Sequence, residues 1–145
     1  MSYSIYTDGS IHENPGKGAW ACVIVHDNER QAVVGFAEST TSNRMEILPA
    51  IEGLKRTPER AKVKVVSDCK YLVDGFNKWM DKWIARHWLN SGGKPVLNQD
   101  LWRELRKLVS TREVEFIWVR GHNGHEMNEE VHRLACEELD RQINE

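Results

Sequence analysis

Three acidic residues that lie far apart in the sequence are the first candidates for chemistry. Asp8 and Asp68 each follow a short β-prone run, in "YTDGS" and "VVSDC", and Glu46 lies near the start of a helical segment, in "SNRMEIL". Strand ends and helix starts hold a side chain on a rigid element that still reaches solvent. If the three carboxylates converge, they provide the oxygen ligands that a hard cation such as Mg²⁺ prefers.

Each acid also has an ordinary structural explanation. Asp frequently turns or caps the chain after a strand, and this explanation is favoured for Asp8 or Asp68 taken alone. The residues about one helical turn from Glu46 are not large apolar side chains, so Glu46 should point away from the apolar stripe of its helix. An exposed Glu is common on any protein surface. A metal site therefore requires all three acids to meet.

The stretch "NEEVHRLA" raises a separate question about His132. The expected inner stripe of its helix consists of Val131, Leu134, Ala135 and Leu139. His132 lies about 100° around the helix from Val131, with Cys136 one turn later, so it borders this stripe. The helix alone favours a histidine packed on its neighbours at the rim. The same position would also allow His132 to reach into a cleft.

The elements that must position these residues follow from hydrophobic periodicity and turn signals. Strands are expected at 3–7, 19–27, 32–39, 62–68 and 113–121, and helices at 41–56, 69–88, 96–110 and 128–143. The second and third strands should form an antiparallel hairpin. The order β-β-β-α-β-α-α-β-α, with no repeat or linker, predicts a single α/β domain over residues 1–145 with a mixed sheet.

Two details of the expected helices can be checked. Pro49 lies inside the first helix and should kink it or delay its start, because proline removes a hydrogen bond and crowds the preceding turn. The inner stripe of helix 69–88 is expected to contain Leu72, Phe76, Trp79, Trp83 and Ile84. That of helix 96–110 is expected to contain Leu101, Leu105, Leu108 and Val109.

Composition and charge narrow the class of protein. A net charge of −2 does not indicate a generic nucleic-acid binder, but residues 78–112 hold eight Lys or Arg against three acids. Residues 126–145 hold seven acids against two Arg, and two solvated faces would explain both segments. No apolar run approaches the roughly 20 residues of a membrane span, and no secretory signal is visible. Cys22, Cys69 and Cys136 form no CxxC pair, so the reduced cytoplasm is the expected location. The lack of a long apolar run predicts no membrane association.

Five segments together resemble the motifs of type 1 ribonuclease H in order and spacing. They are "YTDGS", "NPGKGAW", "TTSNRMEILPAI", "SDCKYLVDGF" and "FIWVRGHNGHEMNEEVHRLA". Residues 79–102 also resemble the basic protrusion of the bacterial members. The resemblance covers essentially the whole chain. It implies a ribonuclease H-like fold, with a five-stranded mixed sheet flanked by helices. The implied function is an endoribonuclease that cuts the RNA strand of RNA/DNA hybrids and leaves 5′-phosphates.

The resemblance also implies a site of four acids that binds two Mg²⁺ ions, with Mn²⁺ as a possible substitute. The first three acids correspond to Asp8, Glu46 and Asp68, with Asp8 shared by both metals, and the fourth position holds His132. A neutral imidazole suits Zn²⁺, Ni²⁺ or Mn²⁺ better than Mg²⁺. His132 could ligate one metal, act through a water, or leave one metal site weak and the enzyme slow. His122, in "RGHNGH", is implied to assist proton transfer or product release, although it could be an ordinary loop histidine.

Substrate contacts are likewise implied by the resemblance. Asn14 and Asn43 resemble residues that contact the nucleic-acid backbone near the cut, and Thr41 resembles part of a pocket for a DNA phosphate. Ser42 and Lys70 stand where bacterial members commonly have Asn and Gln. In the protrusion, Lys78, Lys82, Arg86 and Lys94 could neutralise phosphates. Trp79 is the expected groove residue, although Trp at helical spacing also suits a core.

Three functions remain open from the sequence. The first is a metal-dependent endoribonuclease acting on RNA/DNA hybrids. The second is a weakened or inactive domain of the same fold that binds hybrid or double-stranded RNA, having lost the fourth acid. The third is a related nuclease or transposase acting on DNA. The start at Met1 and the chain length favour a free-standing, monomeric enzyme.

Overall fold

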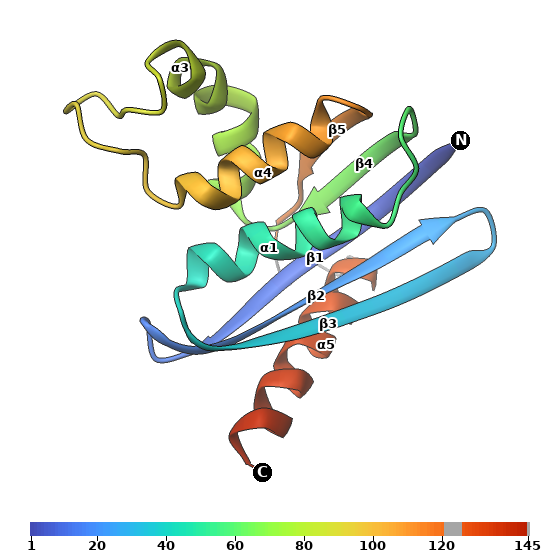
Figure 1. The fold of residues 1–145 in the computed structure, drawn as a ribbon. Coiled ribbons are helices and arrows are strands. Elements are labelled where there is room, and N and C mark those ends of the chain that lie inside the picture. Colours follow the sequence, from blue (N-terminus) through green and yellow to red (C-terminus); the bar gives the residue numbers. More distant parts are fainter. Residues whose placement is uncertain (121–125, 145) are drawn as a thin grey trace.

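The computed structural model describes residues 1–120 and 126–144. The strands are β1 (Ser2–His12), β2 (Gly16–His26), β3 (Glu29–Thr40), β4 (Lys62–Ser67) and β5 (Glu113–Trp118). The helices are α1 (Ser42–Lys55), α2 (Lys70–Asp74), the π-helical segment η1 (Gly75–Trp79), α3 (Met80–Ala85), α4 (Gln99–Val109) and α5 (Glu126–Ile143). Figure 1 shows their arrangement. No helix in these ranges is long and apolar enough to cross a membrane.

The five strands form one mixed sheet in the order β3-β2-β1-β4-β5. β1, β2 and β3 pair antiparallel, as the hairpin prediction required, whereas β4 and β5 run parallel to β1. The parallel pairing of β1 with β4 stops at Thr7 and Ser67. The expected α/β fold with a five-stranded mixed sheet is therefore confirmed.

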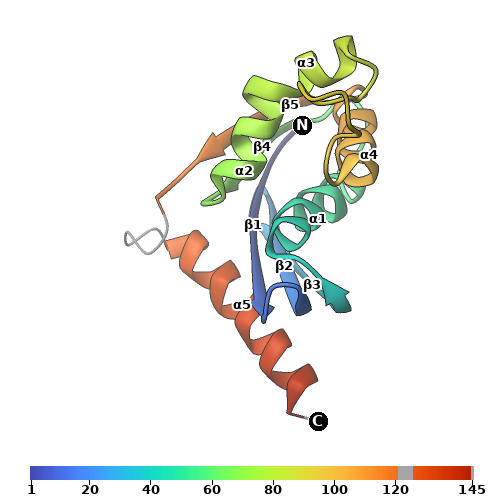
Figure 2. The same ribbon diagram turned by 90° about the vertical axis from the view of Figure 1, so that its left-hand side faces the viewer.

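Helices cover both faces of the sheet. α1 and α4 lie on one face and α5 crosses the other, as Figure 2 shows. Successive side chains of β1 point to opposite faces of the sheet, so the strand contacts the helices on both faces. Ile5 packs toward Gly53 of α1 in a core that also contains Trp102 of α4, while Asp8 reaches toward α5. The core under α1 and α4 is what holds the first layer rigidly on the strands.

One expected boundary was wrong. Asp8 does not end its strand, because residues 8–12 continue the antiparallel pairing with β2 as far as His12 opposite Lys17. Only the parallel pairing ends beside Asp8. For Pro49, either a kink or a late helix start was expected. The late start does not occur, since α1 begins at Ser42 directly after its N-cap Thr41.

The predicted inner stripe of helix 69–88 was partly wrong. Helical residues run from Lys70 to Ala85, but η1 is a π-helical turn within them. A π-turn inserts one extra residue, so the inward face shifts by one position. Met80 is accordingly 2% exposed, whereas Trp79 is 39% exposed and Ile84 is 37% exposed.

The stripes of the other two helices were closer to expectation. In α4, Leu101 and Leu105 are buried as predicted, but Trp102, which was not predicted, is also fully buried. In α5, Val131, Ala135 and Leu139 are buried. Leu134 is only half-buried. α5 therefore presents a narrower apolar stripe to the sheet than the sequence indicated.

Candidate active site

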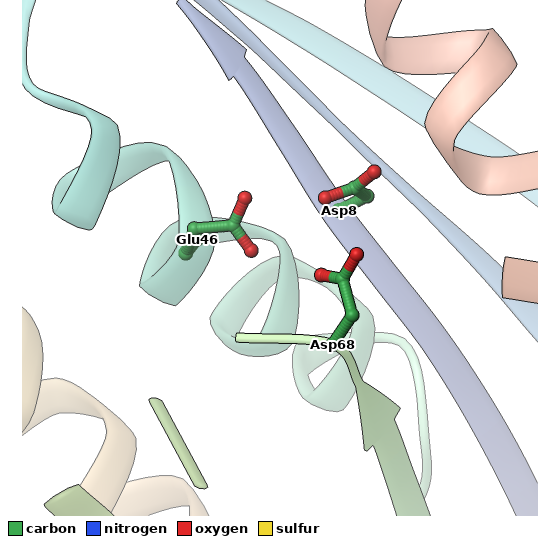
Figure 3. Close-up of side chains that lie close together, drawn as sticks. All are labelled: Asp8, Glu46 and Asp68. Carbon is green, nitrogen blue, oxygen red and sulfur yellow. The ribbon is translucent and has the colours of Figure 1, made fainter. Parts of the chain in front are cut away.

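Three acidic side chains from three elements meet at one place on the sheet. Asp8 lies in β1, Glu46 lies in α1, and Asp68 directly follows β4. Figure 3 shows their carboxylates pointing toward one another. One carboxylate oxygen of each residue lies within 4.8 Å of those of the other two. This spacing allows all three side chains to contact the same small group of cations.

The strand pairing explains why Asp8 and Asp68 are neighbours. Thr7 and Ser67 are the last partners of the parallel β1–β4 ladder, so the next residue on each strand is an aspartate. The main-chain oxygen of Asp68 accepts a hydrogen bond of 3.0 Å from Trp118 Nε1 at the end of β5. Three parallel strands thus fix the position of this pair.

Gly9 brings Glu46 to the same place. A Cβ on Gly9 would lie 2.5 Å from the main-chain oxygen of Met45, so only glycine lets α1 approach β1 this closely. The Gly9 amide donates to Glu46 Oε1 at 3.0 Å and to Asp8 Oδ1 at 2.9 Å. One backbone N–H therefore orients two of the three carboxylates.

The cluster carries more negative charge than its surroundings satisfy. Asp8 is 3% exposed, and Glu46 Oε2 is buried and accepts no hydrogen bond from the described residues. Burial raises the pKa of Glu46 well above its usual range, and the charges of Asp8 and Asp68 raise this pKa further, against the Gly9 amide. Clustered carboxylates of this kind fit divalent cations, which would remove the repulsion and occupy the unsatisfied oxygen.

His132 approaches the cluster from the opposite layer. Its Nδ1 lies 2.8 Å from Asp8 Oδ2, and because an ionised carboxylate only accepts hydrogen bonds, Nδ1 carries the proton. The His132 side chain is 41% exposed. The sequence placed His132 at the rim of the buried stripe. The structure shows it at that rim and in direct contact with Asp8.

The predicted backbone-contact residues gather at the start of α1. Asn14 Nδ2 donates to Ser42 Oγ at 3.1 Å, and the Ser42 amide donates back to Asn14 Oδ1 at 3.3 Å. Thr41 Oγ1 accepts from the Arg44 amide at 3.3 Å and so caps the helix. Asn43 lies in the same first turn. Helix N-termini favour anions because amide N–H groups and the helix dipole point outward there.

Lys70 is the first residue of α2, two positions after Asp68. Its Nζ is 5.2 Å from the centroid of the Trp118 ring, a cation–π contact. Trp118 was not predicted from the sequence as part of the site. It is 40% exposed, and its indole nitrogen donates a hydrogen bond to the main-chain oxygen of Asp68. The only signal was its place at the end of a strand, opposite Ser67, and that pairing is a tertiary feature.

The protrusion residues are not brought to the acids. Lys82 lies in α3, which stands away from the sheet in Figure 1, and Trp79 is the last residue of η1, directly before α3. Trp79 packs near Trp83, with 6.2 Å between ring centroids, and Lys82 is exposed. Lys78 pairs with Asp74 at 3.6 Å. His122 lies outside the described residues.

The acid cluster is distinct from a cavity of about 630 Å³ at the opposite end of the same strands. Ser2, Lys62 and Glu113 are among the residues that line this cavity, and none of the three clustered acids is. The acids sit instead at the carboxyl ends of β4 and β5, where α/β sheets generally hold their ligands. This placement is compatible with a long substrate lying across the surface.

The chain is similar in sequence to a known protein family and to individual proteins. The sequence model of a family described as RNase H matches residues 1–140. A protein named Ribonuclease H from Caldanaerobacter subterraneus subsp. tengcongensis is 44% identical over 142 residues, covering 97% of this chain and 93% of the relative.

Two solved structures are similar in fold. LC9-RNase H1, described as a type 1 RNase H with the type 2 active-site motif, matches with a TM-score of 0.84 and 28% identity, covering 97% of this chain and 73% of that chain. A foamy viral protease-reverse transcriptase in complex with RNA/DNA hybrid matches with a TM-score of 0.77 and 16% identity, covering 93% of this chain and 19% of that chain.

Proposed function

Since the chain belongs to the ribonuclease H family, we propose that it is an endoribonuclease that hydrolyses the RNA strand of RNA/DNA hybrids. The observation that carries this proposal is the meeting of Asp8, Glu46 and Asp68 within 4.8 Å. A domain that only binds nucleic acid gains nothing from clustered acids turned toward phosphate. The RNA 2′-hydroxyl, which can both donate and accept, provides a means of distinguishing RNA from DNA.

The same proposal includes two divalent cations, with Mg²⁺ as the physiological metal and Mn²⁺ as a substitute. Asp8, Glu46 and Asp68 would hold them, with Asp8 shared. Such a pair of cations stabilises negative charge on the attacking and leaving oxygens of a phosphodiester. The buried, unsatisfied Oε2 of Glu46 supports this assignment. Glu46 and Asp68 also orient the attacking water, and His122 assists proton transfer to the leaving group or product release.

Two surfaces would hold the substrate. Asn14, Ser42 and Asn43, beside the Thr41 cap, contact the backbone near the cut, where the α1 N-terminus favours phosphate. Lys82 and Trp79 in the protrusion contact the other strand through charge and stacking. Lys70, held over Trp118, would reach phosphate or hydroxyl close to the acids.

A second candidate function is a weakened or inactive member of the family that still binds hybrid or double-stranded RNA. The observation that favours it is the contact between His132 and Asp8. A neutral histidine adds no negative charge to the cluster, and its Nδ1–H already occupies one oxygen of Asp8.

One experiment separates these functions. The protein is incubated with labelled RNA/DNA hybrid, duplex RNA and duplex DNA in Mg²⁺, in Mn²⁺ and in chelator. Cleavage of the RNA strand of the hybrid alone, abolished by chelator and by Asp8→Asn, is expected. Glu38→Gln is the matched control, because Glu38 is exposed and lies outside the cluster. Binding without cleavage under every metal would support the second function, and cleavage of duplex DNA would contradict both.

We also propose that residues 1–145 form a single domain that acts as a monomer. One cooperative unfolding transition and a mass near 16.8 kDa in solution are expected from calorimetry and light scattering.

A further inference from the structure

Cys136 lies one helical turn after His132 on α5 and faces its second ring nitrogen. Cys136 Sγ is 3.6 Å from His132 Nε2 and 3.7 Å from Ser10 Oγ of β1. Cys136 is half-buried, whereas the His132 side chain is 41% exposed. A thiol and an imidazole nitrogen are therefore held side by side on a part of α5 that is not fully buried.

The separation of these two atoms matches that of two ligands on one zinc ion. Zn²⁺ binds imidazole nitrogen at about 2.0–2.1 Å and thiolate sulfur at about 2.3 Å in tetrahedral geometry, which places the two ligand atoms about 3.5 Å apart. Nitrogen and sulfur ligands also select Zn²⁺ over Mg²⁺, which prefers oxygen. The His132–Cys136 pair thus differs in chemistry from the acid cluster beside it.

Asp8 supplies the orientation that metal-binding histidines generally have. Such histidines donate their other ring N–H to a carboxylate or carbonyl, which fixes the tautomer and the ring orientation. His132 Nδ1 lies 2.8 Å from Asp8 Oδ2. With its proton on Nδ1, the ring presents the lone pair of Nε2 toward Cys136.

We propose that His132 Nε2 and Cys136 Sγ form a binding site for Zn²⁺ that inhibits the nuclease. Binding forms one Zn–N and one Zn–S bond and releases the thiol proton to solvent, and water completes the coordination. Zinc at Nε2 holds the Nδ1–H of His132 on Asp8 Oδ2, so this oxygen becomes less available to a cation at the acid cluster. By thermodynamic linkage, a cation bound at the acid cluster weakens the binding of zinc by the same factor. The inhibition rests on the proposed function, but the zinc binding does not.

Binding is tested with Co²⁺ in place of Zn²⁺ on the full chain without Mg²⁺, because thiolate ligation gives a sulfur-to-cobalt charge-transfer absorption. The band is expected in the wild type, is lost in Cys136→Ser, and persists in Cys22→Ala and Cys69→Ala. Cys22 is buried with its pKa raised to about 12. Cys69 follows Asp68 directly in the sequence, and burial also raises its pKa to about 12. No band in the wild type, or a band that survives in Cys136→Ser, would overturn the site.

Inhibition is tested by titrating Zn²⁺ into hybrid cleavage at constant Mg²⁺, with each protein compared with its own zinc-free rate. Loss of a ligand should raise the half-inhibiting zinc concentration of Cys136→Ser by at least about tenfold. Equal zinc sensitivity in both proteins would overturn the coupling. A wild type that shows the cobalt band but cleaves no hybrid would contradict the proposed function and leave the zinc site established.

Discussion

At the residue scale, the acid cluster combines strong orientation with incomplete charge balance. Gly9 and His132 supply hydrogen bonds to Asp8, while Glu46 Oε1 accepts from the Gly9 amide and Glu46 Oε2 has no donor among the described residues. Burial without a full set of donors raises the pKa of Glu46. The residues are therefore prepared for cations at a cost in the stability of the cation-free protein.

The first prediction concerns that cost. Because the pKa of Glu46 is raised in the folded state, the folded protein binds more protons than the unfolded chain. The free energy of unfolding should therefore fall as pH rises from about 4.3, the ordinary pKa of Glu, through the raised value. In chelator at pH 8, Glu46→Gln should be more stable than the wild type, because the neutral amide removes a buried charge and its repulsion with Asp8 and Asp68.

Urea unfolding between pH 4 and 8 measures this effect, with Glu38→Gln as the exposed control. The difference should shrink when Mg²⁺ is added, because the cation favours the ionised form. A Glu46→Gln protein with the wild-type pH slope in chelator would contradict the prediction.

The second prediction concerns His132. His132→Asp adds a fourth carboxylate, which favours Mg²⁺, whereas the imidazole suits Mn²⁺ better. The ratio of hybrid cleavage in Mg²⁺ to that in Mn²⁺ should rise by about tenfold in His132→Asp, the lower end of the effect of changing a residue around a metal. The same variant should be less stable in chelator, because it replaces a hydrogen bond to Asp8 with repulsion. Identical metal profiles for the two proteins would count against a role for His132.

At the element scale, close approach decides where helices sit. Gly9 lets α1 contact β1 through the main chain of Met45. Pro49, one turn later, has no N–H to donate to the Met45 carbonyl, and this carbonyl is the group that packs against Gly9. The proline thus fits a helix that is held by the sheet as well as by its own hydrogen bonds. η1 determines which residues at the start of the protrusion face the core. With its π-turn, Met80 is buried and Trp79 is exposed.

The third prediction tests the packing of η1. A Cβ on Gly75 would lie 2.3 Å from the ring of Trp102, which is fully buried. Gly75→Ala should lower the free energy of unfolding by about 1–3 kcal/mol, the usual cost of overpacking. Chemical denaturation measures it. Gly92→Ala is the matched control, because the nearest atom to a Cβ there is 3.4 Å away. Equal stability of the two variants would show that Trp102 yields at no cost.

At the whole-molecule scale, charge is distributed unevenly around a nearly neutral chain. Residues 78–112, which contain the protrusion, are rich in Lys and Arg. Acids dominate α5, which lies on the face of the sheet opposite α1 and α4. A nucleic acid that reaches the protrusion would meet positive charge there, whereas the acids of α5 would repel it. Net charge alone conceals this separation.

The fourth prediction measures the contribution of the protrusion. Lys82→Ala should weaken hybrid binding, raise KM more than it lowers kcat, and reduce the slope of log K against log salt concentration by about 0.9, the value for one phosphate contact. Fluorescence anisotropy across a salt series gives the slope. Lys64→Ala is the control, because Lys64 is exposed but lines the cavity at the other end of β4. An unchanged salt slope in Lys82→Ala would place Lys82 outside the bound substrate.

The sequence alone predicted the order of the elements, the mixed sheet and the family, because periodicity, turn residues and five motifs in register are local signals. It also identified Asp8, Glu46 and Asp68 as candidates to meet, since each was expected at a strand or helix boundary. The sequence did not predict the full length of β1, the inward face of the helical residues after Gly75, or the contact between Trp118 and Asp68. In each case pairing or packing with a distant segment, namely β2, Trp102 or the end of β4, overrode the local pattern.

Only the tertiary structure decided how the site is electrostatically arranged. Nothing local to "RMEIL" indicates that the Glu46 carboxylate is buried, or that one Gly9 amide serves two acids. Nor does "NEEVHRLA" reveal that His132 lies between Asp8 and Cys136. Burial, shared donors and the distance between charges depend on which elements pack together, and a sequence read along the chain does not contain these distances.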